Sequence, residues 1–396
     1  MKQGYIPGKT LGIIGGGQLG RMMLPEARRL GLKTAVYTAS PDDPAVGGCD
    51  IFVQGSLTDA DGIAAFAEQC DYLTIEIEHV ALEGLRRAET SGCTVFPPAD
   101  ALQTVQDKLA QRRCFAGLPQ PEYAELPDFT PDDEPGWRQR VVAAAEQFGY
   151  PVVQKTRRGG YDGRGVAVLR SEQDVFDRNG RLLLGDSYLE AFVPLHKELG
   201  VIVARSASGE IKAFPVTEMR FDPDANICTS VAFPARIDSK TAAEGVRIAR
   251  QAAERLKVVG LLAVELFVSE NGDVVLNEVA PRPHNSGHGT IEGVPTSQFA
   301  QHLRAGIGLP LGSVAPVIPT VMNNLLGAPG ADGVPVITGL DAMLALPCTQ
   351  LHWYGKPAVR PGRKMGHVTV TAESLEEALA RADKAAETVR VEAQDE

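Results

Sequence analysis

A glycine-rich turn between a strand-like run and a helix-like run most constrains the fold of this 396-residue chain. The stretch TLGIIGGGQLGRMML, residues 10–24, places Gly15, Gly17 and Gly20 directly after an apolar run. This G-x-G-x-x-G spacing is typical of a strand that turns sharply into a helix, whose N-terminus favours an anion. The spacing alone leaves open a dinucleotide, another anion, or a turn that only packs helix against sheet.

The first hundred residues alternate strand-like and helix-like segments. Helical patterns such as DADGIAAFAEQC separate apolar runs at residues 11–14, 34–37, 51–53, 72–75 and 94–96. This alternation predicts a parallel sheet with helices on both faces. Pro25 lies inside the first predicted helix, so we expect a kink there or a short helix. A further helix is expected over roughly residues 99–116.

An NAD site usually has an acidic residue at the end of the second strand, where it binds the ribose 2′-hydroxyl. Here that strand reads KTAVYTASPDDP and ends at Tyr37 and Thr38. The first acid, Asp42, comes only after a Ser-Pro turn. The sequence therefore disfavours an NAD-dependent dehydrogenase and favours another anion at the turn.

Composition excludes several classes of protein. With 39 basic and 50 acidic residues the net charge is −11, which argues against non-specific nucleic-acid binding. The sequence has no apolar run of about 18 residues and begins without the apolar core of a signal peptide. The six cysteines form no C-x-x-C pair, which favours reduced thiols over a disulfide or metal framework. We therefore expect a cytoplasmic protein without a membrane or nucleic-acid partner.

A β-hairpin is predicted within LLAVELFVSENGDVVLNEVAPRPHNSGH, residues 261–288. Asn271-Gly272 is a strong signal for a two-residue turn. Centring the turn there predicts the cross-strand pairs Ser269 with Val274, Phe267 with Leu276, and Glu265 with Glu278. Directly opposed carboxylates repel, so this pair calls for a cation, and Mg²⁺ suits few carboxylates plus phosphate oxygens. A protonated carboxyl or a different register is the alternative.

Two further segments carry phosphate-binding chemistry. YPVVQKTRRGGYDGRGVAVL, residues 150–169, predicts a strand with Lys155, a mobile glycine-rich loop and a second strand. Glycine amides can wrap phosphates and a lysine can neutralise them, although the Walker A pattern is absent and a plain flexible hairpin fits as well. DSYLEAFVPLHKELGVIVAR predicts a strand that runs into a linker, where the backbone can bind adenine and Glu198 a ribose. Glu198 could equally be a solvated surface charge.

Taken in order, seven motifs over roughly residues 10–385 resemble the ATP-grasp superfamily, and within it the N5-carboxyaminoimidazole ribonucleotide synthases. They are GIIGGGQLGRM, IEIEHV, KTRRGGYDGRG, YLEAFV, VELF, NEVAPRPHNSGH and RPGRKMGH. The resemblance implies an ATP-grasp fold that combines α/β and α+β parts. We expect an N-terminal Rossmann-like domain over 1–107, an ATP-grasp domain over 108–310 with a mobile lid at about 125–195, and a small C-terminal domain over 311–396.

The resemblance also implies an activity. In this family ATP phosphorylates bicarbonate to carboxyphosphate, and that species, or CO₂ released from it, carboxylates the amine of 5-aminoimidazole ribonucleotide (AIR). The products are N5-carboxyaminoimidazole ribonucleotide, ADP and phosphate, so the implied enzyme is an ATP-dependent carbon–nitrogen ligase of purine biosynthesis. The family implies Mg²⁺ as cofactor, ATP as co-substrate and a homodimer.

Site residues follow from the resemblance by motif. The residues implied to bind ATP are Lys108, Lys155, Gly160, Tyr161, Asp162, Gly163, Arg164, Gly165, Glu190, Ala191, Phe192, Val193, Glu198, Asn277 and Glu278. Those implied to bind the ribonucleotide, which also contacts the Gly15–Gly20 turn, are Gln18, Leu19, Glu76, Asn285, Lys356, Arg363 and Lys364. The implied metal ligands are Glu265 and Glu278, and the implied catalytic residues are Arg282, His284, Tyr161 and Lys364.

Two departures and three rival functions accompany this resemblance. Phe221 stands where the family often has a histidine, and Ala280 where many superfamily members have a metal-binding asparagine. The nearest rival is the formate-dependent glycinamide ribonucleotide transformylase, also an ATP-grasp enzyme, but Gln18, Asn285 and His288 favour the AIR enzyme. An NAD-dependent dehydrogenase and a non-catalytic nucleotide-binding regulator are the rivals from other classes.

Overall fold

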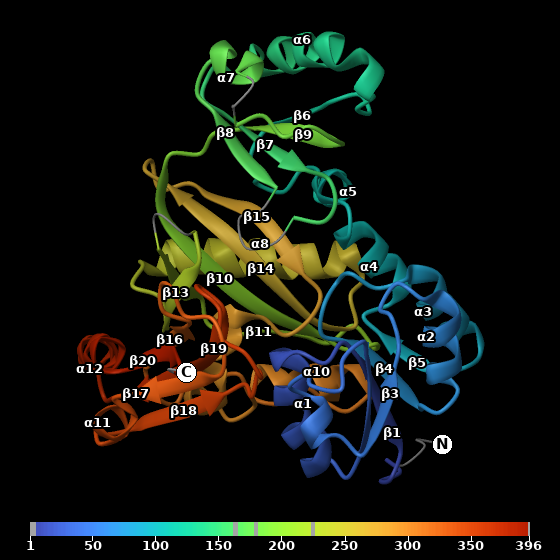
Figure 1. Ribbon diagram of the computed structural model, residues 1–396, viewed down its shortest axis with the longest axis vertical. Coiled ribbons are helices and arrows are strands. Elements are labelled where there is room, and N and C mark those ends of the chain that lie inside the picture. Colours follow the sequence, from blue (N-terminus) through green and yellow to red (C-terminus); the bar gives the residue numbers. More distant parts are fainter. Residues whose placement is uncertain (1–4, 161–164, 178–180, 223–225, 395–396) are drawn as a thin grey trace.

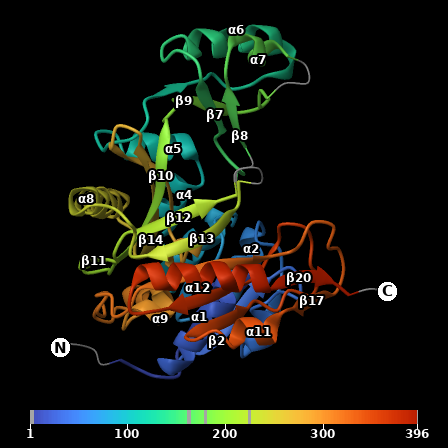
Figure 2. The ribbon, with the colours of Figure 1, turned by 90° about the vertical axis from the view of Figure 1, so that its left-hand side faces the viewer.

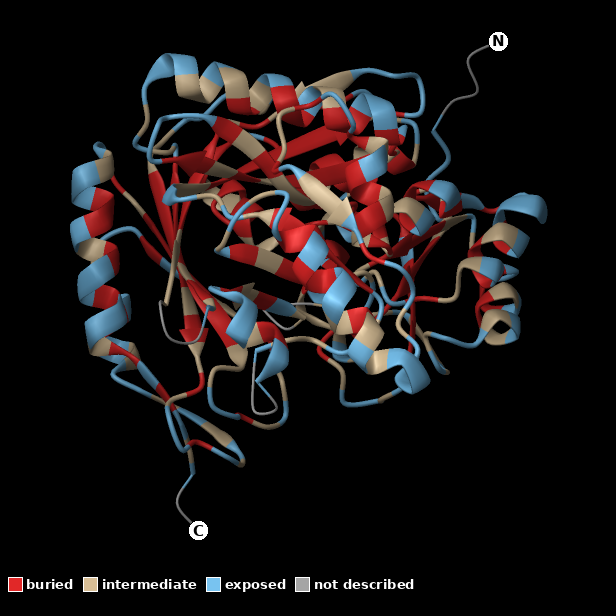
Figure 3. Cartoon of the chain, turned by 90° about the horizontal axis from the view of Figure 1, so that it is seen from above, coloured by how far each residue is buried: buried red, intermediate tan, exposed pale blue. Residues whose placement is uncertain are grey.

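The computed structural model describes residues 5–160, 165–177, 181–222 and 226–394. Figure 1 shows an N-terminal part in blue, a small sheet with its helices in green at one end, and a central sheet that C-terminal strands in orange and red extend. The small green part, residues 123–191, is the segment expected to be the lid and keeps that name below. Buried residues line the sheets and the inner faces of the helices, whereas the outer helix faces are exposed (Figure 3). Within these described parts, no helix combines the length and apolar character that a membrane span requires.

The N-terminal part is built on a parallel sheet with the order β3-β2-β1-β4-β5. Its strands are β1 (Thr10–Ile14), β2 (Lys33–Thr38), β3 (Ile51–Gln54), β4 (Tyr72–Ile75) and β5 (Thr94–Phe96). Its helices are α1 (Gln18–Arg29), η1 (Val46–Gly48), α2 (Ala60–Ala67) and α3 (Leu82–Thr90). The predicted parallel sheet is confirmed, and each predicted strand agrees with the observed one to within one residue at each end.

Helix α1 continues past Pro25 to Arg29, so the expectation of a short first helix is wrong. Pro25 lies on the exposed side of α1, where water can serve the carbonyl that loses its amide donor. Met23, Leu24 and Ala27 pack into an apolar cluster on the other side. This packing supports the turn that follows the proline.

The single helix predicted over 99–116 is also wrong, because the chain forms α4 (Ala99–Val105) and then α5 (Lys108–Cys114). Asp107 separates them and accepts hydrogen bonds from the amides of Leu109 and Ala110 at 3.0 and 3.2 Å. An aspartate in this position caps a new helix and satisfies amides that would otherwise lack partners. The break places Lys108 at the first position of α5.

The central sheet has the order β15-β14-β10-β12-β13-β16-β19-β18, with β11 beside β10. Its strands are β10 (Leu195–Arg205), β11 (Ile211–Ala213), β12 (Thr217–Phe221), β13 (Cys228–Phe233), β14 (Gly260–Ser269), β15 (Val274–Ala280), β16 (Thr320–Leu326), β18 (Thr349–Trp353) and β19 (Lys364–Thr371). Helix α8 (Ser239–Leu256) packs its apolar side on β10, β14 and β15. After β15 come η3 (Asn285–Gly287), α9 (Thr290–Gly293) and α10 (Gln298–Gly306).

Three C-terminal strands extend the central sheet, because β16 pairs with β13, and β19 and β18 follow it. Strands β17 (Pro335–Thr338) and β20 (Arg390–Ala393) instead form a separate two-stranded sheet. Helix α12 (Leu375–Thr388) packs on β16 and β19, and Figure 2 shows it along the outside of the C-terminal part. The predicted cap of this helix is confirmed, since Ser374 accepts the amide of Glu377 at 3.2 Å. Helix α11 (Leu340–Leu344) lies between β17 and β18 in the sequence.

The lid is a small antiparallel sheet with the order β6-β9-β7-β8. Its elements are β6 (Tyr123–Glu125), η2 (Pro131–Asp133), α6 (Glu134–Ala145), β7 (Val152–Thr156), β8 (Val166–Leu169), α7 (Glu172–Phe176) and β9 (Ser187–Ala191). Trp137 is fully buried in its core. Lys155 lies on β7, and β9 runs through Ala191 into a linker before β10, so both predicted strands are confirmed.

A buried histidine joins the N-terminal sheet to the central sheet. His302 on α10 accepts the Leu261 amide at its Nδ1, at 3.1 Å, and its Nε2 lies 2.8 Å from the Thr74 hydroxyl. Burial lowers the pKa of His302 to about 3. His288 and His367 are also buried, and burial together with nearby histidines lowers their pKa values well below the ordinary value. These side chains are therefore neutral in the folded protein.

We predict that the free energy of unfolding falls as the pH falls from 7 to 4.5. These histidines take up protons once the chain unfolds, so their stabilising contribution is complete above pH 6.5 and is lost below it. Each contributes a slope of about 1.4 kcal/mol per pH unit. Burial and the nearby Glu265 raise the pKa of Glu198 to about 7, which offsets part of this slope.

The measurement is urea unfolding at several pH values, with His302→Gln as the comparison. A glutamine can accept from Leu261 and donate to Thr74 without titrating. The free energy of unfolding of this variant should therefore depend less steeply on pH, by the contribution of one histidine. A slope equal to that of the wild type would contradict the neutral, buried state of His302.

Candidate active site

The glycine-rich turn of the N-terminal part binds an internal carboxylate. Glu76 follows β4 and accepts the amide of Gly17 at 2.7 Å and that of Gly20 at 3.2 Å. A Cβ added at Gly15 or Gly17 would come within 2.5 Å of the Glu76 side chain. Burial raises the pKa of Glu76, although the two amide bonds oppose this. The glycine spacing is therefore explained by Glu76, and the expectation that these amides bind a ligand is corrected.

The hairpin between β14 and β15 has a three-residue turn, not the predicted two-residue turn. Ser269 accepts the amide of Gly272 and donates its own amide to Asp273, both at 2.9 Å. Gly272 has a φ of +85°, as in a type I turn that ends in a left-handed glycine. The register next to the turn is therefore shifted by one residue from the prediction.

The predicted pairs Ser269 with Val274 and Phe267 with Leu276 are wrong, but Glu265 does pair with Glu278. The observed neighbours are Val268 with Val274, Phe267 with Val275 and Leu266 with Leu276. A bulge between Glu265 and Leu266 in the pairing then restores the expected register. The carboxylate pair was predicted correctly because the longer turn and the bulge shift the register by one residue each in opposite directions, so the two shifts cancel.

The bulge places Asn277 and Glu278 on the same side of β15. Leu276 and Val279, which flank them, both pack into the apolar core under α8. A bulge lets two successive side chains leave the core face together. Asn277 and Glu278 line one narrow pocket with Lys108 and Lys155.

Each carboxylate of the facing pair already has a cationic or donor partner from the chain. Glu278 forms an ion pair with Lys108, and Glu265 Oε1 lies 3.2 Å from His284 Nε2. Although burial opposes it, His284, Lys108 and Lys364 lower the pKa of Glu265. Burial and the nearby Lys155 in turn lower the pKa of Lys108 to about 8.

Glu190 on β9 is buried between two cations. Its carboxylate lies 2.6 Å from Arg112 Nε and 2.9 Å from Lys155 Nζ, and it accepts the Tyr188 hydroxyl at 2.7 Å. Lys155 also donates to Asn277 Oδ1 at 2.9 Å. Although burial alone would raise it, Lys155 and Arg112 keep the pKa of Glu190 well below its ordinary range. This network joins the lid to α5 and β15.

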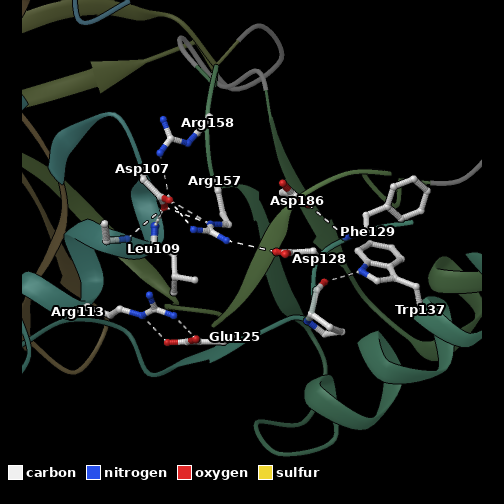
Figure 4. A network of polar contacts seen from close by, with 12 residues as sticks. Asp107, Leu109, Arg113, Glu125, Asp128, Phe129, Trp137, Arg157, Arg158 and Asp186 are labelled. Atoms are coloured by element: carbon white, nitrogen blue, oxygen red, sulfur yellow. Dashed lines mark hydrogen bonds and ion pairs between the residues drawn. The ribbon is translucent and has the colours of Figure 1, made fainter. Parts of the chain in front are cut away.

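A second network ties the start of α5 to the end of β7 (Figure 4). Arg157 donates to Asp107 from Nη2 at 2.6 Å and from Nε at 3.2 Å, and its carbonyl accepts the Lys108 amide at 2.8 Å. Its Nη1 also lies 3.6 Å from Asp128. Although burial opposes it, Arg157 lowers the pKa of Asp107. The network fixes Lys108 relative to Lys155.

The predicted adenine hinge spans the end of β9 and the linker before β10. The Glu190 side chain is buried and paired, and Glu190 lies in the sheet between β6 and β7. Phe192 is 42% exposed beside it, and Ala191 and Val193 are half-buried. Glu198, with its pKa raised to about 7, follows on β10.

The loop after β15 joins the N-terminal part to the carboxylate pair. Arg282 Nε lies 2.9 Å from Glu78 Oε1 in the segment after β4, while His284 contacts Glu265. Asn285 Nδ2 is buried and bonds to no nitrogen or oxygen among the described residues, and only the weakly accepting Cys228 thiol is close to its side chain. An unpaired buried donor is costly, so Asn285 is a candidate for contact with a substrate.

The basic residues of the C-terminal part lie at the start of β19 and in the loop before it. Lys356 Nζ donates to the carbonyl of Lys364 at 2.6 Å, and Arg363 Nη1 donates to that of Ala358 at 2.7 Å. Lys364 also acts on the pKa of Glu265. Lys356 and Arg363 therefore hold the loop through bonds to its carbonyl groups. Lys364 is close enough to act electrostatically on Glu265.

The remaining predicted contacts come from the start of α1 and from the loop after β7. Gln18 begins α1 beside the glycine turn, but Leu19 is only 7% exposed in the core, so its main chain is the part that can reach a ligand. Gly160 and Gly165 border the lid loop, whereas Tyr161, Asp162, Gly163 and Arg164 lie outside the described residues. Phe221, at the end of β12, packs beside a small apolar cluster.

Sequence reasoning missed several residues that build the site. Gln111 and Arg112 lie three and four residues after Lys108, on the same side of a helix, and a correct helix start would have revealed them. Arg112 donates to the Leu276 carbonyl at 2.8 Å, and Gln111 accepts the Val279 amide at 3.2 Å. Glu78 alternates with Glu76 in IEIEHV, a signal that was present but unused.

Comparison with known families agrees with this architecture. The ribonucleotide synthetase preATP-grasp domain matches residues 8–106, the ATP-grasp domain matches 117–299, and the phosphoribosylaminoimidazole carboxylase C-terminal domain matches 320–381. The N5-carboxyaminoimidazole ribonucleotide synthase of a Synechocystis strain is 39% identical over 385 residues, covering 93% of each chain. The chain belongs to the N5-carboxyaminoimidazole ribonucleotide synthase family.

Some members of this wider group are longer. The chain is 38% identical to the phosphoribosylaminoimidazole carboxylase of Schizosaccharomyces pombe and matches 93% of its own length to 66% of that relative. A relative from Vigna aconitifolia is matched over 64% of its length. The chain thus spans about two thirds of these relatives.

Solved structures show the same fold. The N5-carboxyaminoimidazole ribonucleotide synthetase from Thermotoga maritima superposes with a TM-score of 0.86 at 39% identity, covering 98% of this chain and 100% of that one. The Aspergillus clavatus synthase in complex with ADP and 5-aminoimidazole ribonucleotide gives 0.86 at 32% identity, covering 96% and 98%. The expected ATP-grasp fold with its Rossmann-like N-terminal part is therefore shown.

We predict that Glu278→Gln lowers kcat/KM for ATP by more than about 100-fold, since even outer partners of a metal contribute 10- to 100-fold. The amide can still accept from Lys108, so the fold should survive, but a charged oxygen opposite Glu265 is lost. The measurement is ATP turnover against Mg²⁺ concentration. Glu270→Gln, at the exposed tip of the same hairpin, is the control and should behave as the wild type. Near-normal turnover at limiting Mg²⁺ would contradict the assignment.

Proposed function

We propose that the protein is an N5-carboxyaminoimidazole ribonucleotide synthase. It converts ATP, bicarbonate and AIR into N5-carboxyaminoimidazole ribonucleotide, ADP and phosphate through carboxyphosphate. The observation that carries the proposal is the loop after β15, which sets Arg282 against Glu78 and His284 against Glu265. One short loop thus borders both the carboxylate pair and the segment after β4, where the charge of Arg282 also acts on Glu76, as transfer of a carboxyl group between two substrates requires.

The ATP end of the site is made by α5, the lid and β15. Lys108 and Lys155 meet the phosphates, and the amides of Gly160 and Gly165 assist them. Because Lys155 is already held by Glu190 and Asn277, it keeps its position without ATP. The main chain at 190–193 binds adenine, and Glu198 binds the ribose.

The carboxylate pair suits Mg²⁺. Among the described residues no group of three or more His, Cys, Asp or Glu could hold a metal alone. Glu265 and Glu278 instead face each other beside the Asn277 oxygen, and Mg²⁺ is commonly held by one or two carboxylates together with substrate phosphates. Bound there, the ion would neutralise phosphate charge, and Lys108 would be released from Glu278 toward the nucleotide.

The transfer step uses the loop residues. Arg282 and the Nε2–H of His284 donate to the carboxyphosphate oxygens, and fixed donors of this kind stabilise the developing charge. AIR lies between Glu76, Gln18 and Asn285, and its phosphate is bound by Lys356, Arg363 and Lys364. Tyr161, in the lid loop, helps to exclude water from the short-lived acyl phosphate.

The test is ADP release in CO₂-depleted buffer that contains ATP, Mg²⁺ and AIR. We predict little ADP until bicarbonate is restored, and then one ADP for each carboxylated product. Formate should not replace bicarbonate, and added NAD⁺ should change nothing. Full activity without bicarbonate, or greater activity with formate and glycinamide ribonucleotide, would favour the transformylase or an unrelated ATPase.

A further inference from the structure

The loop that carries Arg282, His284 and Asn285 contains little regular structure of its own. Between β15 and α9 it forms only the short helix η3. Irregular backbone must be fixed by other groups if its side chains are to keep a useful geometry. The fixing group in this structure is the side chain of Gln298, the first residue of α10.

Gln298 is fully buried and binds the main chain of His284 on both sides. Its Oε1 accepts the His284 amide at 2.9 Å, and its Nε2 donates to the His284 carbonyl at 2.8 Å. The same Nε2 lies 3.0 Å from Nδ1 of His288. A Cβ at Gly287 would come within 2.3 Å of Oε1, so glycine is required for this close approach.

Gln298 fixes the main chain of His284, and Ser286 then fixes the direction of its ring. The ring Nδ1 accepts the amide of Ser286 at 3.3 Å and lies 2.9 Å from its hydroxyl, which leaves the proton of the neutral ring on Nε2. That Nε2 lies 3.2 Å from Glu265. Gly200, which pairs with Glu265, gives Ser286 its space, since a Cβ there would lie 2.9 Å from Ser286.

Through His288, Gln298 also connects the loop to the C-terminal part. The rings of His288 and His367 stack with centroids 4.6 Å apart, and those of His367 and His352 with centroids 4.4 Å apart. His367 lies on β19, three residues after Lys364. The loop is therefore held at one end by Gln298 and packed at the other against the strand that begins with Lys364.

We propose that Gln298 is a positioning residue for the transfer step, acting through the main chain of His284. The proposal rests on the proposed function, because it assigns to Gln298 the placement of a ring that contacts the acyl phosphate. A displacement of about 1 Å at such a group can cost about 100-fold in rate. Removing the amide should therefore lower kcat and leave ATP binding nearly intact.

The chain offers a matched control on the same helix. Gln301 is also fully buried and makes the same pair of bonds to another loop, accepting the Gly312 amide at 2.8 Å and donating to the Gly312 carbonyl at 3.0 Å. No predicted site residue lies in the loop around Gly312. Gln298→Leu and Gln301→Leu thus remove the same two main-chain bonds, one pair next to the site and one away from it.

The first experiment measures kcat, the KM for ATP and the urea midpoint of both variants at saturating AIR and bicarbonate. We expect both variants to lose stability, Gln298→Leu somewhat more because it also loses the His288 contact. The kcat should be at least about tenfold lower for Gln298→Leu only, with a KM for ATP within about twofold of wild type in both variants. Equal kcat values for the two variants would reduce Gln298 to a structural role and overturn the proposal.

The variant Gln298→Glu adds a pH test. An un-ionised carboxyl has one donor and one acceptor, so it can repeat both bonds to His284, whereas a carboxylate cannot donate. The kcat of Gln298→Glu relative to wild type should therefore rise as the pH falls, while that of Gln298→Leu should stay low throughout. Parallel profiles for the two variants would contradict the bonding role of Gln298.

A readout without substrate separates this inference from the proposed function. In ¹⁵N-histidine NMR, with His284→Ala to assign the signal, His284 should carry its proton on Nε2 in the wild type and in Gln301→Leu. Gln298→Leu should shift the ring toward a mixture of tautomers. An unchanged His284 signal would refute the positioning role, even if the wild type failed the test with AIR and bicarbonate.

Discussion

The buried carboxylate of Glu190 is the interaction on which the arrangement of the site depends. It neutralises Arg112 and Lys155, which come from α5 and the lid, and Arg112 in turn bonds to the Leu276 carbonyl of β15. Removing one partner from a buried charged group leaves an uncompensated charge, at a cost of about 3–5 kcal/mol. Three segments far apart in the sequence are thus held together around Lys155, one of the two lysines proposed to bind phosphate.

The glycine-rich turn shows how one backbone geometry serves different partners. The turn exposes amides at the start of α1, as the spacing predicts, but the anion that binds them is Glu76 of the same chain. The physical demand is the same in both cases, because a helix N-terminus favours negative charge of any origin. A local pattern can therefore predict the anion without predicting which molecule supplies it.

The hairpin shows the same limit for register. Alternation and Asn271-Gly272 predicted two strands and the pairing of Glu265 with Glu278, and both were right. The three-residue turn and the bulge at Asn277 were not predicted, and the bulge depends on the packing of Leu276 and Val279 in the core under α8. Without the bulge, Asn277 and Glu278 would point to opposite faces of the strand, and the site would lose its contact between Lys155 and Asn277.

By itself the sequence determined the local elements: the parallel N-terminal strands, the lid strand with Lys155, the cap at Ser374 and the paired glutamates. These depend on periodicity and turn residues within a few positions of one another. The tertiary structure alone decided the ion pair of Asp107 with Arg157, the cationic partners of Glu190, the amides bound by Glu76, and the bonds from Gln298 to the main chain of His284. Each joins residues distant in sequence and depends on burial, where an unpaired polar group is expensive and its partner is set by packing.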